Sequence, residues 1–90
     1  MTNQIITVRG KVQGVGFRYF TKLKADELGL TGTVQNQEDG SVLIQVCGSE
    51  NGLRLFIEWC HQGPASAFVS ELEYRPLEKG IGFEDFSIIR

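Results

Sequence analysis

The sequence predicts an α+β fold with the element order β-α-β-β-α-β and room for a short fifth strand. Two observations lead to this prediction. Two segments carry their apolar residues on one helical face, which is typical of amphipathic helices. The segments around them are short, rich in β-branched residues and bounded by glycine, proline or Asp-Gly turns, which is typical of strands. Strands in this order form an antiparallel sheet with both helices on one face.

The first half of the chain contains a strand, a glycine-rich loop and a helix. A β-branched run that ends near Gly10 predicts the strand, and the loop occupies residues 11–16. Gly29 predicts the end of the helix, because glycine adopts the left-handed conformation of a C-cap without strain. Apolar or small residues recur on one face of this helix, predicted over 17–28: Phe17, Thr21, Ala25 and Leu28.

A hairpin and a second helix follow. The hairpin strands are predicted over 31–36 and 41–46, joined by a turn that contains Asp39-Gly40. Ser49 is a suitable N-cap for a helix over about 51–62, and Gly63-Pro64 ends it. The apolar stripe of this helix consists of Leu53, Phe56, Ile57 and Cys60.

The last part of the chain predicts a fourth strand over 67–75 and a short closing strand over 86–89. The loop between them contains Pro76, Gly80 and Gly82. The complete order is that of a ferredoxin-like, split βαβ sandwich. We expect residues 1–90 to form a single domain, because a chain of this length builds one modest core.

The composition indicates a folded protein without a general attraction for polyanions. Hydrophobic residues make up 41% of the chain and charged residues 22%, and the net charge is 9 − 11 = −2. We therefore expect no nucleic-acid partner, and an anionic ligand requires a local site. The sequence has neither an apolar stretch of ~20 residues nor a signal-peptide pattern, so we expect a cytoplasmic location and no membrane partner. Cys47 and Cys60 are predicted to lie too far apart to pair.

The loop before the first helix is predicted to bind an anion. Gly14 and Gly16 lack Cβ atoms, which lets the backbone turn sharply and approach a ligand closely. The first amides of a helix have no intrahelical partners and attract anions. Arg18 adds a planar cation that matches phosphate oxygens. The alternative is a tight turn beside a surface arginine, because neither common nucleotide-binding motif is present.

The run from Gly10 to Arg18 resembles the signature of the acylphosphatases, G-x-V-Q-G-V-x-F-R, at every fixed position. A second family element, G-x-V-x-N-x-x-D-G-x-V, is matched over residues 32–42 and includes Asn36. Gly63-Pro64 and residues 86–88 also fit, so the resemblance covers essentially the whole chain. Departures from the usual pattern fall at positions that carry no chemistry in the family: Thr33, Gln35 and Leu43.

The resemblance implies hydrolysis of the carboxyl-phosphate bond of an acyl phosphate, without a metal, a cofactor or a covalent intermediate. It implies that Arg18 binds the phosphate and that Asn36 orients the attacking water. Inorganic phosphate or a similar anion is expected to occupy the same site, and the protein is expected to be a monomer. The expected phosphate ligands are the backbone amides of the loop and helix start: Gln13, Gly14, Val15, Gly16, Phe17 and Arg18.

Three other functions compete with this interpretation. The first is a phosphate- or acyl-phosphate-binding module without catalysis, in which Asn36 is only a turn residue. The second is RNA binding, which is disfavoured because the third strand, 41–46, lacks the aromatic residues that stack on bases. The third is a metal carrier, which is disfavoured because the chain has no C-x-x-C motif.

Overall fold

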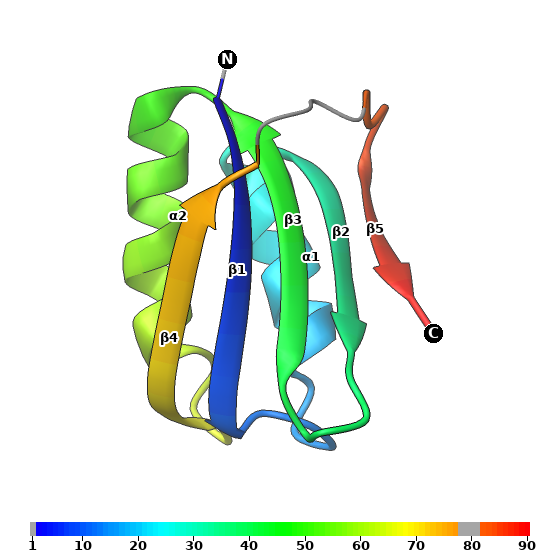
Figure 1. Ribbon diagram of the computed structural model, residues 1–90. Coiled ribbons are helices and arrows are strands. Elements are labelled where there is room, and N and C mark those ends of the chain that lie inside the picture. The colour runs from blue at the N-terminus through cyan, green and yellow to red at the C-terminus, as the bar shows by residue number, and fades with distance from the viewer. Residues whose placement is uncertain (1, 78–81) are drawn as a thin grey trace.

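The computed structural model describes residues 2–77 and 82–90 and has the predicted element order (Figure 1). Gly80, in the predicted loop before the closing strand, lies outside the described residues. The strands and helices are β1 (Thr2–Lys11), α1 (Phe17–Glu27), β2 (Thr31–Asn36), β3 (Val42–Gly48), α2 (Glu50–Gln62), β4 (Phe68–Pro76) and β5 (Phe86–Ile89).

The element boundaries agree with the predictions to within a few residues, apart from one pair of strand ends. β1 begins at Thr2 and β3 continues to Gly48, although neither end carries a β-strand signal in the sequence. These ends pair with each other, Thr2 opposite Gly48 and Asn3 opposite Cys47. Each segment is a strand because the other one satisfies its backbone groups.

The sheet has the order β4-β1-β3-β2-β5. The first four strands are antiparallel to their neighbours, as predicted, but β5 pairs with β2 in parallel, so the prediction of an antiparallel sheet is wrong for this strand. Figure 1 shows the reason. β4 ends and β5 begins at the same end of the sheet, on opposite edges, so β5 runs in the same direction as its neighbour β2.

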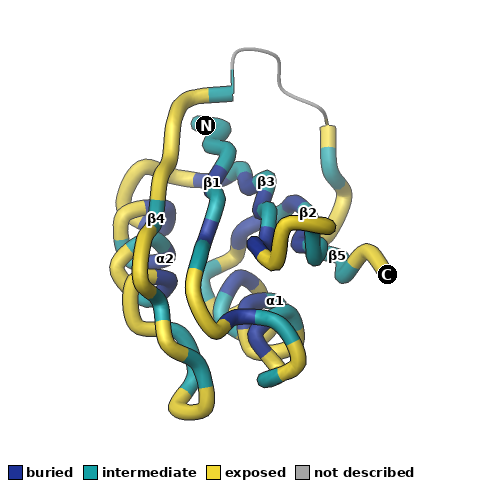
Figure 2. Tube along the Cα trace, turned by 60° about the horizontal axis from the view of Figure 1, so that its bottom comes forward, coloured by how far each residue is buried: buried dark blue, intermediate teal, exposed yellow. Residues whose placement is uncertain are grey.

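Both helices cover one face of the sheet, and the core lies between these two layers. Alternate residues of the strands point toward the helices, so Ile6, Val34 and Ile44 are completely buried. On α1 the buried residues are Phe17, Thr21 and Ala25, and Leu28 is packed against the core, which matches the predicted helical face. Figure 2 shows that burial concentrates in the central strands and helices, whereas β4 is largely exposed at its edge.

The helix ends follow the sequence signals. The hydroxyl of Ser49 accepts a hydrogen bond from the amide of Gly52 at 3.0 Å and caps α2. Gly29 has φ 70°, which ends α1 in the left-handed conformation. No helix in the described part of the chain is both long and apolar enough to cross a membrane.

The two cysteines are free thiols, as predicted. Cys60 is completely buried in α2, and burial raises the pKa of its thiol because the thiolate is poorly solvated there. Cys60 is therefore a small hydrophobic residue of the core.

The edge strand β5 is attached to the core mainly through Phe86. This side chain is 1% exposed and lies edge-to-face with Phe56 of α2, with ring centroids 6.1 Å apart. Edge-to-face pairs add to the hydrophobic gain from burial. Phe86 thus determines where the C-terminal residues lie relative to α1 and β2.

We predict that Phe86→Ala lowers the free energy of unfolding by about 3–5 kcal/mol, because it leaves a cavity between β5 and α2. Urea unfolding followed by circular dichroism measures this loss. Phe68→Ala is the matched control, since Phe68 is 66% exposed on β4, and it should change the free energy of unfolding by no more than about 0.5 kcal/mol. Equal losses in the two variants would contradict the assigned role of Phe86.

Candidate active site

The candidate site lies at one end of the sheet, where three connections meet. β1 and β3 are antiparallel with Val8 opposite Val42. The loop that follows β1 and the turn that precedes β3 therefore emerge at the same end of two adjacent strands. Asn36 also lies at this end, as the last residue of β2 and the partner of Val42.

The glycine-rich loop exposes the start of α1. Gly14 and Gly16 have φ values of 74° and 80°, in the left-handed region that favours glycine. Gly16 is the N-cap residue of α1, and no side chain forms a cap hydrogen bond there. The first turn of α1 contains no acidic residue. The partial positive charge of the helix start is therefore not neutralised by a neighbouring carboxylate in α1.

A pocket of about 210 Å³ opens beside this helix start. This volume suits a small anion, because pockets for drug-sized ligands start at roughly 300 Å³. The lining residues include two arginines and none of them has an acidic side chain. They are Val12, Gly14, Gly16, Phe17, Arg18, Tyr19, Asn36, Ile88 and Arg90.

The two predicted catalytic side chains, Arg18 and Asn36, both line this pocket although they lie on different elements. Arg18 is in the first turn of α1, and its Nη1 donates a hydrogen bond to the carbonyl of Ile89 at 3.3 Å. Asn36 Oδ1 is buried and has no hydrogen-bond partner among the described residues. A buried acceptor without a donor costs free energy, so this oxygen is suited to accept a hydrogen bond from a bound water or ligand.

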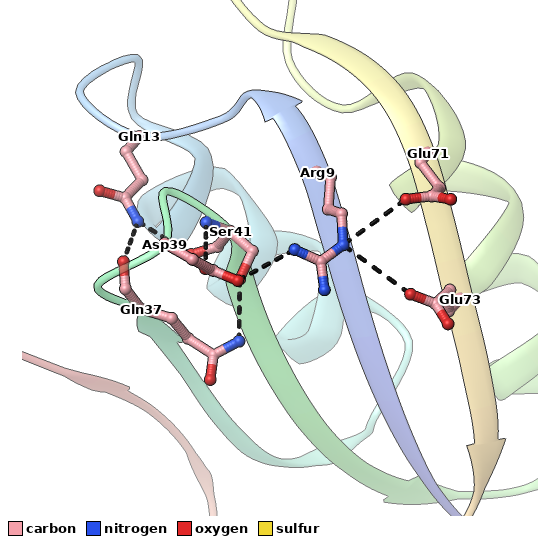
Figure 3. A network of polar contacts seen from close by, with 7 residues as sticks. All are labelled: Arg9, Gln13, Gln37, Asp39, Ser41, Glu71 and Glu73. Atoms are coloured by element: carbon pink, nitrogen blue, oxygen red, sulfur yellow. Dashed lines mark hydrogen bonds and ion pairs between the residues drawn. The ribbon is translucent and has the colours of Figure 1, made fainter.

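Two of the predicted phosphate-binding residues, Gln13 and Val15, do not line the pocket. The side chain of Gln13 is directed toward the turn between β2 and β3, where its amide donates two hydrogen bonds (Figure 3). Val15 packs against the core, and its carbonyl accepts a hydrogen bond from the hydroxyl of Ser66 at 2.7 Å. These contacts hold the loop, and the role of both residues as backbone ligands stays a prediction.

The turn between β2 and β3 is held by a polar network centred on Asp39 (Figure 3). Its carboxylate accepts hydrogen bonds from the amide and hydroxyl of Ser41 and from Arg9, which lies 3.0 Å away. The bonds from Ser41, followed by that from Arg9, lower the pKa of Asp39 to about 2. Arg9 also lies 3.5 Å from Glu71 and 3.8 Å from Glu73 on β4.

The structure adds pocket residues that the sequence did not indicate. Tyr19 follows Arg18 on α1, and Ile88 and Arg90 lie at the end of the chain. No local pattern identifies the last two, because only the parallel pairing of β5 with β2 brings them to the pocket. No group of three or more His, Cys, Asp or Glu side chains suited to hold a metal is present in residues 2–77 and 82–90.

Comparison with known proteins establishes the family. The family model described as Acylphosphatase matches residues 4–88. The chain belongs to the acylphosphatase family. It is 48% identical over 81 residues to the acylphosphatase of Aeromonas hydrophila subsp. hydrophila, covering 88% of this chain and 90% of the relative.

Solved structures of acylphosphatases have the same fold. The crystal structure of acylphosphatase from Bacillus subtilis superposes with a TM-score of 0.96 at 39% identity, and the match covers 100% of both chains. The chain also resembles part of a larger protein. Full-length HypF, in its phosphate- and nucleotide-bound form, matches with a TM-score of 0.87 at 29% identity, covering 99% of this chain and 12% of that chain.

We predict that Asp39 makes the free energy of unfolding depend on pH in the acid range. Because its pKa in the folded protein, about 2, lies below the usual value of 3.8, its contribution is fully present above pH ~4 and is lost as the pH falls toward 2. Urea midpoints of the wild type and of Asp39→Asn, measured from pH 7 to pH 2, should differ most near neutrality and converge at the acid end. A difference between the two urea midpoints that stays constant from pH 7 to pH 2 would contradict the lowered pKa of Asp39.

Proposed function

We propose that this member of the acylphosphatase family hydrolyses acyl phosphates to a carboxylate and inorganic phosphate through the pocket between the α1 start and Asn36. The observation that carries the proposal is that Asn36, whose buried Oδ1 has no hydrogen-bond partner among the described residues, lines the same small pocket as Arg18. One group is suited to a water molecule and the other to a phosphate. Hydrolysis of a phosphate anhydride requires both reactants in one place.

In the proposed complex the phosphate lies at the N-terminus of α1. The guanidinium of Arg18 and the first amides of the helix neutralise the phosphoryl oxygens, together with the loop amides from Gln13 to Phe17. Charge on these oxygens changes during phosphoryl transfer, so donors that are fixed in advance stabilise the transition state. The hydrogen bond from Arg18 to the Ile89 carbonyl restricts the guanidinium before the substrate arrives.

Asn36 positions the nucleophile. Its Oδ1 accepts a hydrogen bond from a water molecule and directs a lone pair of that water toward phosphorus. A new bond forms between the water oxygen and phosphorus while the bond from phosphorus to the acyl oxygen breaks. The carboxylate leaves with the electron pair of the broken bond.

The remaining steps need little further chemistry from the protein. A carboxylate is a good leaving group, so the reaction requires no strong general acid. The proton of the attacking water passes to an oxygen of the substrate's own phosphate. The reaction thus uses positioning and charge stabilisation, and we propose that it needs no metal or other cofactor.

The proposal also covers the domain organisation, the oligomeric state and the location of the protein. We infer that residues 1–90 act as one domain, because buried or partly buried residues of all the strands and helices form one core. The monomeric state and the cytoplasmic location remain predictions from the sequence. Charges on the edge strand β4 disfavour edge-to-edge association. These charged residues are Glu71, Glu73 and Arg75.

We predict that the wild type hydrolyses benzoyl phosphate in the presence of a metal chelator, measured as loss of substrate absorbance. Arg18→Ala should abolish measurable turnover because the phosphate loses its cation. Asn36→Ala should lower kcat by about 10²-fold or more, as expected for the loss of one oriented transition-state contact. Both variants should remain folded by circular dichroism.

The matched controls lie on α2, away from the pocket. Arg54→Ala and Asn51→Ala remove the same two side-chain types, which contact each other at 2.7 Å and do not line the pocket. Both controls should retain wild-type turnover. No turnover by a folded wild type that still binds inorganic phosphate would favour the non-catalytic binding module instead.

The proposed proton route makes a separate prediction about His61. This residue lies in the last turn of α2 and lines a different groove, beside β4. We expect His61→Ala to change kcat by less than about twofold, because the substrate phosphate accepts the proton without an enzyme base. A loss as large as that of Arg18→Ala would refute the route.

A further inference from the structure

The side chain of Gln13 connects the two halves of the candidate site. Its Nε2 donates one hydrogen bond to the carbonyl of Gln37 and another to the carbonyl of Ser41, each at 2.8 Å (Figure 3). Gln13 belongs to the loop before α1, whereas Gln37 directly follows Asn36 in the chain. One amide group therefore joins the loop beside the phosphate position to the peptide next to Asn36.

These two bonds complete the hydrogen bonding of two carbonyl groups in the turn, those of Gln37 and Ser41. Each carbonyl already accepts a bond from within the turn, from the Gln37 amide to Ser41 at 2.8 Å and from the Gly40 amide to Gln37 at 3.1 Å. Gln13 supplies the second donor to each oxygen, and both new bonds are partly buried. A carbonyl oxygen has two lone pairs, so this arrangement satisfies both groups fully.

The other link from this turn to a neighbouring strand is more exposed to solvent. The ion pair between Arg9 and Asp39 joins the turn to β1, with exposed side-chain fractions of 42% and 53%. Exposed ion pairs are weakened by solvent and salt. Gln13 is therefore better placed than Arg9 to fix the turn against the loop.

The loop, in contrast, has anchors that do not depend on the Gln13 side chain. Val12 and Phe17 on either side of it are each 1% exposed in the core. Ser66 holds the carbonyl of Val15 at 2.7 Å. Loss of the Gln13 amide is thus expected to release the turn and to leave the loop and the start of α1 in place.

We propose that the side chain of Gln13 has a positioning role: it sets the place of Asn36 relative to the phosphate without itself touching the substrate. This role rests on the proposed hydrolysis, in which Asn36 orients the water. A displacement of about 1 Å in a reacting group costs up to about 10²-fold in rate. Weakening the link should therefore lower kcat and leave phosphate binding largely unchanged.

The test is Gln13→Met, which keeps the length of the side chain and removes both donors. With benzoyl phosphate, kcat should fall by about tenfold or more, whereas KM and the inhibition constant of inorganic phosphate should change by less than about threefold. Gln45→Met is the matched control on β3, where residue 45 points to the sheet face opposite the helices. This control should keep the wild-type kcat.

A double-mutant cycle separates positioning from general destabilisation. If Gln13 acts through Asn36, then adding Gln13→Met to Asn36→Ala should lower kcat by less than about twofold further. A full additional tenfold loss would overturn the proposal. A wild-type kcat in Gln13→Met would also overturn it, as would a loss of phosphate binding as large as the loss of kcat.

A second variant covers the case in which Gln13→Met does not fold. Gln13→Asn retains the amide donors on a side chain one methylene shorter, so it should give a smaller loss of kcat with KM unchanged. A rise in KM as large as the fall in kcat would overturn the proposal, because the side chain would then act on phosphate binding. A wild type that does not hydrolyse benzoyl phosphate would overturn the proposed function, and the role of Gln13 with it. An active wild type with an unaffected Gln13→Met variant would overturn only the role of Gln13.

Discussion

The candidate site depends on the antiparallel pairing of β1 with β3 at the centre of the sheet. Val8, Val42 and Ile44 face the helices and are completely buried. A slip of one residue would turn these side chains to the other face, so burial fixes the register. With Val8 opposite Val42, the loop after β1 and the turn before β3 have to meet. The proposed positions of the phosphate and of the attacking water are thus set by the same hydrophobic core that stabilises the fold.

An anion site in a chain of net charge −2 requires positive charge to be arranged locally. Arg9 and Arg18, two of the arginines near this end of the sheet, have different environments. Arg9 is surrounded by Asp39, Glu71 and Glu73 and helps to hold the turn. Arg18 lines a pocket whose lining residues include no acidic side chain, beside the unneutralised start of α1. This separation leaves Arg18 available to a phosphate.

Much of the fold follows from local patterns, because each helix and each central strand carries its own signal. The stripe from Phe17 to Ala25 predicts which face of α1 is buried, and Asp39-Gly40 predicts the hairpin turn. The parallel direction of β5 was missed. Its direction depends on its pairing with β2 at the far edge of the sheet, and the sequence of a four-residue strand does not indicate which strand it pairs with.

The sequence by itself determined the family, the order of the elements and the candidate residues Arg18 and Asn36, because glycine positions, apolar periodicity and motif spacing are properties of the chain. Only the tertiary structure decided what these residues have as neighbours. It placed Asn36, whose Oδ1 has no hydrogen-bond partner among the described residues, in the lining of the pocket. It also brought Arg90 to the same pocket through β5 and directed Gln13 toward the carbonyls of the turn. These contacts join residues 24 or more positions apart, and the separation in space of such residues depends on sheet register and packing rather than on local sequence.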